Sequence, residues 1–143
     1  MMTSLAPATG DDALDELLAE AMEKFSSHHA NDRKIGIERL WDGFERLKTL
    51  DNRTNKKASV AALLDNITDP AWRAVVEAEM VALTDLGNQF NIRHFETRVA
   101  TLPPGTDDYL FGRMGNMLLH LLLVSGRLEG PQDPSSIEHP YSR

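Results

Sequence analysis

The chain has 143 residues, of which 41% are hydrophobic, and a formal net charge of −7, so we expect a single domain with one hydrophobic core. It holds no cysteine, which excludes disulfides, thiolate nucleophiles and cysteine-ligated metal sites. The N-terminal stretch lacks the apolar run of a signal peptide. The most apolar segment, MLLHLLLV, is far shorter than the about 20 residues of a membrane span. We therefore expect a cytoplasmic protein without membrane contacts.

The spacing of apolar residues predicts five helical segments and no strand. The first covers residues 11–26, and its stripe is Leu14, Leu17, Leu18, Met22 and Phe25. The second covers residues 32–50 after an N-cap at Asn31 or Asp32, and its stripe is Ile37, Leu40, Trp41, Phe44 and Leu47. Gly36 and Gly43 lie seven residues apart on nearly one side of this helix. A close crossing with another helix would explain them, and tolerance of two residues with poor helix propensity would explain them equally well.

Two further helices follow a polar connector. The third covers residues 56–67. The fourth starts at Asp69 as N-cap, with Pro70 at the first helical position, and continues to about residue 91. Its predicted stripe is Trp72, Val75, Val76, Met80, Leu83, Leu86 and Phe90. Residues 93–105 then show no helical pattern, and a loop of this length inside a compact domain often has a function.

The fifth helix is predicted over residues 106–125, with Gly126 as its C-terminal cap. Its leucines cover all sides of the helix: Leu118, Leu119, Leu121, Leu122 and Leu123. Such a helix is either central in a bundle or part of a subunit interface. The sequence thus predicts an all-α five-helix bundle over residues 11–126, with flexible ends at 1–10 and 127–143.

Metal ions and cofactors are not expected. The five histidines are His28, His29, His94, His120 and His139, and no Glu-x-x-His or His-Glu-x-x-His pattern contains any of them. The sequence also has no glycine-rich phosphate loop of the Gly-Lys-Ser/Thr kind. We therefore predict no metal and no cofactor.

The stretch GNQFNIRHFE, residues 87–96, offers a first candidate site. Arg93, His94 and Glu96 could perform acid–base or phosphate chemistry, because histidine titrates near neutral pH and arginine binds phosphate well. A structural role is favoured, since cations just past a helix C-terminus interact with its carbonyl end, and Glu96 can pair with an arginine.

The stretches ERLWDGFERLKTL, GNQFNIRHFE and DYLFGRM resemble small helical domains of bacterial abortive-infection or phage-defence proteins, which border on the HEPN superfamily of helical RNases. The resemblance extends over about residues 24–123. It implies a helical bundle, usually a dimer, that cleaves RNA without a metal. The family's motif, an arginine followed after four to six residues by a histidine, is matched by Arg113 and His120, which share one face of a helix.

Three functions remain open. The first is a non-enzymatic helical interaction module that self-associates through residues 106–125, as a homodimer or with another protein, in a prokaryotic defence-type or regulatory assembly. The alternative is a HEPN-like metal-independent endoribonuclease, with Arg113 and His120 or the 93–96 residues as catalysts. RNA would then bind the basic segment 33–57, which carries a net charge of +4. The third is a small-ligand sensor with the 93–105 loop as lid, in which Arg93 and Arg98 would hold an anionic ligand.

Overall fold

The computed structural model describes residues 8–93 and 102–128, and over these residues the chain is an all-α bundle without strands. Its five helices are α1 (Asp12–Phe25), α2 (Ala30–Leu47), α3 (Lys56–Leu64), α4 (Pro70–Gln89) and α5 (Thr106–Val124). The predicted fold class is confirmed. Of the predicted flexible ends, residues 1–7 and 129–143 lie outside the described residues. Thr9, assigned to the N-terminal end, is buried and bonds Asp15 Oδ1 through both its backbone N–H and its hydroxyl.

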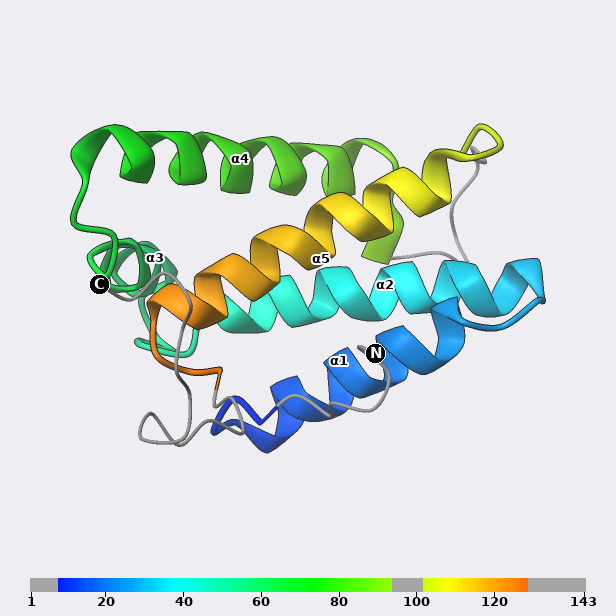
Figure 1. Ribbon diagram of the computed structural model, residues 1–143, viewed down its shortest axis with the longest axis horizontal. Helices are drawn as coiled ribbons and strands as arrows, with labels where there is room; N and C mark the ends of the chain where they lie inside the picture. The colour runs from blue at the N-terminus through cyan, green and yellow to red at the C-terminus, as the bar shows by residue number, and fades with distance from the viewer. Residues whose placement is uncertain (1–7, 94–101, 129–143) are drawn as a thin grey trace, which may run out of the picture.

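The helices α1 and α2 form an antiparallel pair that packs closely along its length (Figure 1). Gly36 permits this approach, because a Cβ atom there would lie 2.8 Å from the backbone N of Phe25 and 2.9 Å from the carbonyl O of Ala21. At Gly43 the neighbour is the Leu18 side chain, 3.2 Å from a built Cβ. Of the two explanations that the sequence leaves open for these glycines, the structure supports the close crossing.

The start of α1 is tied to the end of α2 through Asp11. This residue is the N-cap of α1 and accepts a hydrogen bond from the backbone N–H of Leu14. The Arg46 guanidinium donates two hydrogen bonds to the same carboxylate, at 2.5 and 2.9 Å. Hydrogen bonding to Arg46 lowers the pKa of Asp11 to about 2, against the opposing effect of burial.

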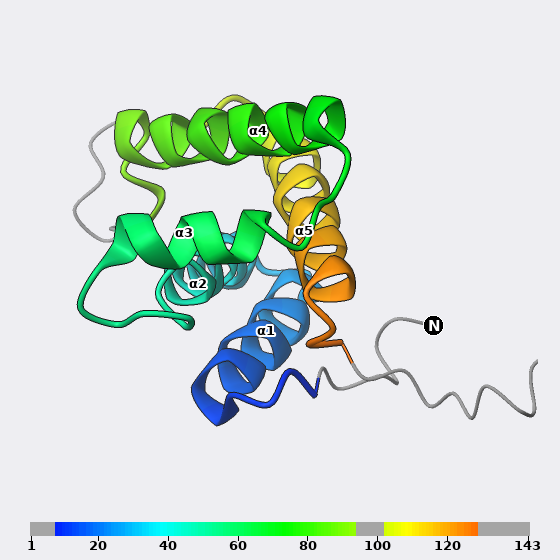
Figure 2. The ribbon, with the colours of Figure 1, turned by 90° about the vertical axis from the view of Figure 1, so that its left-hand side faces the viewer.

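In the middle of the bundle, α2 contacts α1 and α5, and its Trp41 reaches α4 (Figure 2). The Trp41 side chain is only 1% exposed, and its indole N–H donates to the carbonyl O of Leu83 at 3.1 Å. The indole occupies the space beside Gly87, where a Cβ would lie 2.7 Å from two indole atoms. A side chain at position 87 would therefore separate α4 from α2.

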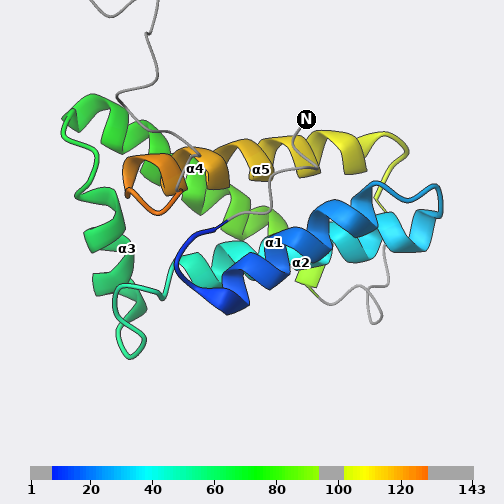
Figure 3. The ribbon, with the colours of Figure 1, turned by 60° about the horizontal axis from the view of Figure 1, so that its bottom comes forward.

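The helix α3 lies across one end of the bundle (Figures 1 and 3). Several helix ends differ from prediction. The helix α2 starts at Ala30 with His29 as N-cap, because the Asp32 carboxylate accepts from Ser27 Oγ instead of capping the helix. The helix α3 ends at Leu64 rather than residue 67, although Ile67 is still buried.

The predicted stripe of α4 is only partly correct. Val76, Met80 and Leu83 are buried as expected, but Trp72 is 46% and Val75 is 52% exposed. The reason is that α4 packs against α2, α3 and α5 from one side, and no described element covers its outer side (Figure 2). On α5, Leu118, Leu121 and Leu122 are buried, whereas Leu123 is 55% exposed. These exposures locate the open surface of the bundle on α4 and α5.

Candidate functional site

Arg113 lies on the side of α5 that faces α4, where Glu79 holds it. The guanidinium Nε and Nη2 each donate a hydrogen bond of 2.8 Å to the two carboxylate oxygens of Glu79. This hydrogen bonding raises the pKa of Arg113 and lowers that of Glu79. The Arg113 guanidinium also lies 5.9 Å from the centre of the Tyr109 ring, one turn earlier on α5. The Nε–Nη2 edge of the guanidinium is thus fully engaged with Glu79.

His120 lies two turns further along the same side of α5. Its Nε2 accepts a hydrogen bond of 2.9 Å from the indole N–H of Trp72 on α4, and the two rings meet edge to face with centroids 5.6 Å apart. Arg113 and His120 therefore share one face of α5, as predicted, but each binds its own residue of α4. Because they are seven residues apart, their Cα atoms lie about 10 Å apart along the helix axis, so the structure does not join them into one catalytic pair.

The stretch GNQFNIRHFE is first of all the end of α4. The helix ends at Gln89, Asn91 adopts a left-handed φ of 50°, and Ile92 turns back into the core with 1% exposure. Arg93 Nε donates a hydrogen bond of 2.7 Å to the Asp42 carboxylate on α2, which ties the end of α4 to α2. His94 and Glu96, the other two candidates of this stretch, and Arg98 lie outside the described residues.

The basic segment 33–57 does not present an open row of cations. Most of its cations are in ion pairs with acidic residues of α1, α2 and α5. These pairs are Arg33–Asp108, Arg39–Glu20, Arg46–Asp11, Lys48–Glu45 and Lys56–Glu45. An RNA backbone would have to compete with these carboxylates for the same guanidinium and ammonium groups.

Lys48 is a feature that periodicity could not show. It is 5% exposed, and its ammonium donates to Thr84 Oγ1 of α4 at 3.0 Å and pairs with Glu45 at 2.7 Å. Burial lowers the pKa of Lys48, while Glu45 opposes that shift. The side chain lines an open cleft of about 270 Å³ between α2, α3 and α4. With its ammonium bonded to both neighbours, Lys48 serves to join α2 to α4.

The most distinctive surface is the outer side of α4 and α5. Four of its side chains are large, apolar or aromatic, and about half exposed: Trp72 (46%), Val75 (52%), Tyr109 (62%) and Leu123 (55%). Val75 lies within one helical turn of both Trp72 and Glu79, and Leu123 lies one turn from His120. The contacts from Trp72 to His120 and from Glu79 to Arg113 join the two helices into one surface, here called the α4–α5 outer face.

No protein-family model matches this chain, and no curated protein or solved structure gives a significant match. In the ranges 8–93 and 102–128, no group of three or more histidine, aspartate or glutamate side chains is arranged to hold a metal ion. None of the helices described is long and apolar enough to cross a membrane.

Proposed function

We propose that this chain is a non-enzymatic helical interaction module that binds another polypeptide through the α4–α5 outer face. The observation that carries the proposal is the exposure of Trp72, Val75, Tyr109 and Leu123 on one side of the bundle. Single exposed apolar side chains are normal on soluble proteins, but a contiguous group of them marks an interaction site.

The composition of this face supports a protein partner. Tryptophan, tyrosine and arginine supply most of the binding energy in protein interfaces, and this face carries Trp72 on α4 and Tyr109 beside Arg113 on α5. Trp72 and Arg113 are also held in position by His120 and Glu79, so little side-chain entropy is lost on binding. The setting we propose, following the sequence resemblance, is a prokaryotic defence-type or regulatory assembly.

A photo-crosslinking amino acid at Val75 tests the proposal in the cells that make the protein. The Val75 side chain is half exposed and cannot form hydrogen bonds, so its replacement leaves the core intact. We expect one or a few adducts of discrete mass from position 75. The same amino acid at Glu16, on the exposed side of α1, is the control and should give none. Equal labelling from both positions, or none from position 75, contradicts an interaction module of this design.

A HEPN-like endoribonuclease is the second candidate, supported by the position of Arg113 and His120 on one face of α5 beside the open surface. Incubation of purified protein with total RNA in EDTA separates the two proposals. Cleavage that disappears in both Arg113→Ala and His120→Ala would establish the nuclease and overturn the non-enzymatic assignment. Intact RNA, or cleavage that both variants retain, removes this candidate.

A further inference from the structure

We infer that the α4–α5 outer face binds a second copy of this chain in a two-fold symmetric dimer, an inference that rests on the proposed function and names its partner. In such a dimer both copies use the same patch, which must therefore be complementary to itself. A patch with an excess of one charge fails this condition, because like charges meet across the axis.

The α4–α5 outer face meets the condition. From Tyr109 to Val124, α5 contains a single acidic or basic residue other than His120, namely Arg113. Its charge is neutralised within the chain by Glu79, through two hydrogen bonds of 2.8 Å. The exposed α4 positions one turn before and one turn after Val75, Ala71 and Ala78, are uncharged as well. An apolar surface with one internally neutralised ion pair can thus pack against its own copy.

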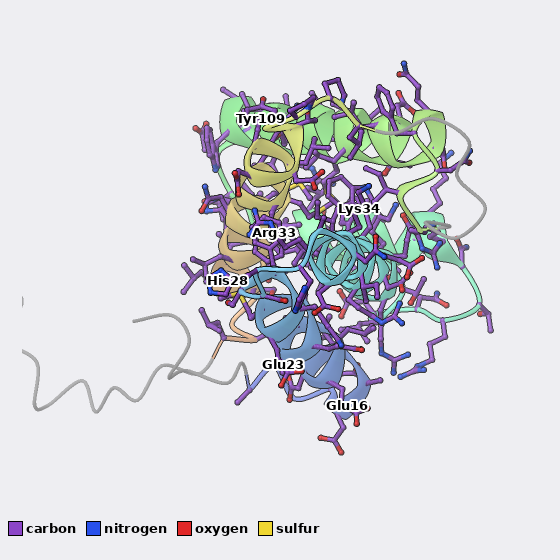
Figure 4. The ribbon with its side chains drawn as sticks, turned by 90° about the vertical axis from the view of Figure 1, so that its right-hand side faces the viewer. Glu16, Glu23, His28, Arg33, Lys34 and Tyr109 are labelled. Carbon is purple, nitrogen blue, oxygen red and sulfur yellow. The ribbon has the colours of Figure 1, made fainter. Side chains whose placement is uncertain are left out.

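The charge of the rest of the molecule points to the same face. The chain carries a net charge of −7, so two copies repel each other unless their acidic surfaces stay apart. Asp12, Glu16 and Glu23 are exposed on α1. Figure 4 places Glu16 and Glu23 on the opposite side of the molecule from Tyr109, which lies where α5 begins beside α4. Contact through α4 and α5 therefore keeps the acidic α1 helices at the two far ends of the dimer.

The size of the face is at the lower end of the range for a specific dimer. The 20 residues of α4 and the 19 of α5 make each helix about 30 Å long and about 10 Å wide, so their common outer side covers roughly 600 Å². Burial of this area on both copies gives about 1,200 Å² in total, which is the lower limit for a stable, specific interface. The exposed parts of Trp72 and Tyr109 alone contribute roughly 200 Å², if an aromatic side chain buries about 200 Å² in full.

Partners of other chemistry fit less well. A basic protein would be attracted to the exposed acids of α1 rather than to a neutral surface. A nucleic acid needs free cations, and the one arginine of this face is already bonded to Glu79. The neutral, apolar character of the face thus favours a second copy of the same acidic chain.

Sedimentation of the purified protein over a concentration series tests the dimer, with Val75→Glu as the disrupting variant. We expect wild type to sediment at twice the mass of one chain. Val75→Glu should weaken the dimer roughly a hundredfold or more, because it places an unpaired carboxylate in the buried interface. Ala19→Glu adds the same charge at an exposed position of α1 and should leave the dimer unchanged. Circular dichroism and thermal unfolding verify that both variants fold.

Cysteine cross-linking supplies an independent readout, since the natural chain holds no cysteine. Asn116 is exposed on α5, one turn from both Arg113 and His120, so Asn116→Cys should give a linked dimer with a short bis-maleimide. Ala19→Cys on α1 should give none. Linkage from Ala19→Cys instead, or a dimer that Val75→Glu leaves intact, overturns this interface.

The outcomes separate the dimer from the proposed function. A wild type that stays monomeric at hundreds of micromolar overturns the dimer. If position 75 then still gives a discrete adduct of other mass in cells, the α4–α5 outer face binds a different protein and the interaction module stands. If position 75 gives no adduct either, both proposals are overturned.

Discussion

Two helix pairs of this bundle are joined in opposite ways. The pair α1 and α2 is joined by close backbone approach at Gly36 and by buried side chains such as Leu14 and Phe44, which are fully buried. The pair α4 and α5 is bridged at its edge by two polar contacts, Glu79–Arg113 and Trp72–His120, beside apolar side chains that stay about half exposed. The first pair buries its apolar surface within the fold, whereas the second leaves apolar side chains exposed.

The largest effect is expected where the first pair is tightest. Gly36→Ala places a Cβ against two backbone atoms of α1, which cannot rotate away, so we expect a loss of about 3 kcal/mol in the free energy of unfolding. Gly115→Ala in α5 is the control. It meets nothing within 4 Å and should instead stabilise the protein by about 0.5–1 kcal/mol through helix propensity. Denaturant unfolding measures both, and a neutral Gly36→Ala would refute the close crossing.

A smaller loss is expected at Asp11, which links the same two helices. Asp11→Ala removes both the N-cap of α1 and the partner of Arg46. It should lower the free energy of unfolding by about 2 kcal/mol near neutral pH. Asp11→Asn keeps a good capping side chain and should cost less, so the difference between the two variants isolates the cap.

The pH dependence of this contribution has a definite sign. Because folding lowers the pKa of Asp11 from 3.8 to about 2, the stabilisation is complete above pH 4 and is lost as the pH falls towards 2. In Asp11→Asn, the stability should therefore fall less steeply between pH 4 and 2 than in wild type. Parallel curves in that window would show that the Arg46 contact is weak in solution.

Between α4 and α5, Glu79→Gln should lower the free energy of unfolding by about 1 kcal/mol. This value is near the upper end for a partly exposed ion pair, because the contact with Arg113 is bidentate. A double-mutant cycle with Arg113→Gln measures the coupling between the two side chains. Since pairing lowers the pKa of Glu79, this coupling should fade in acid, as the carboxylate becomes protonated. A coupling near zero at pH 7 would mean that Glu79 and Arg113 do not hold α4 and α5 together.

The smallest effect is expected at Arg93. Its side chain is 46% exposed and its ion pair with Asp42 lies at the surface, so Arg93→Ala should change the free energy of unfolding by less than about 0.5 kcal/mol. Thermal unfolding measures the change. A loss of several kcal/mol would show that this contact is a main anchor of the α4 end.

Local signals predicted the elements well, because they depend on neighbours in sequence. Asp69 and Pro70 define the start of α4 by capping chemistry alone, and the structure begins the helix at Pro70. Gly36 and Gly43 were compatible with a close crossing, and only the structure shows that α1 approaches α2 there. Helix ends were less certain, as at α3, because the last turn depends on what packs against it.

The site could be predicted only in part. The shared face of Arg113 and His120 follows from their spacing in α5. Their partners Glu79 and Trp72 lie on α4, and the sequence around Arg113 and His120 does not predict contacts with another helix. Periodicity placed Trp72 and Val75 on the apolar side of α4. Periodicity does not show how much of the apolar side of α4 the other helices cover. The contacts with α2, α3 and α5 bury only part of that side, and Trp72 and Val75 lie outside the buried part.

The two tryptophans lie in opposite environments, which makes them separate optical reporters. Trp41 is 1% exposed and bonded to Leu83 O, so its emission should follow the loss of the core. Trp72 is 46% exposed on the α4–α5 outer face, so an aqueous quencher should reach it in the native state, and the proposed binding at this face would shield it. The variant Trp72→Phe retains only the buried indole of Trp41, so its fluorescence reports unfolding alone. Subtracting its fluorescence from that of wild type leaves the signal of Trp72, which reports binding at the α4–α5 outer face.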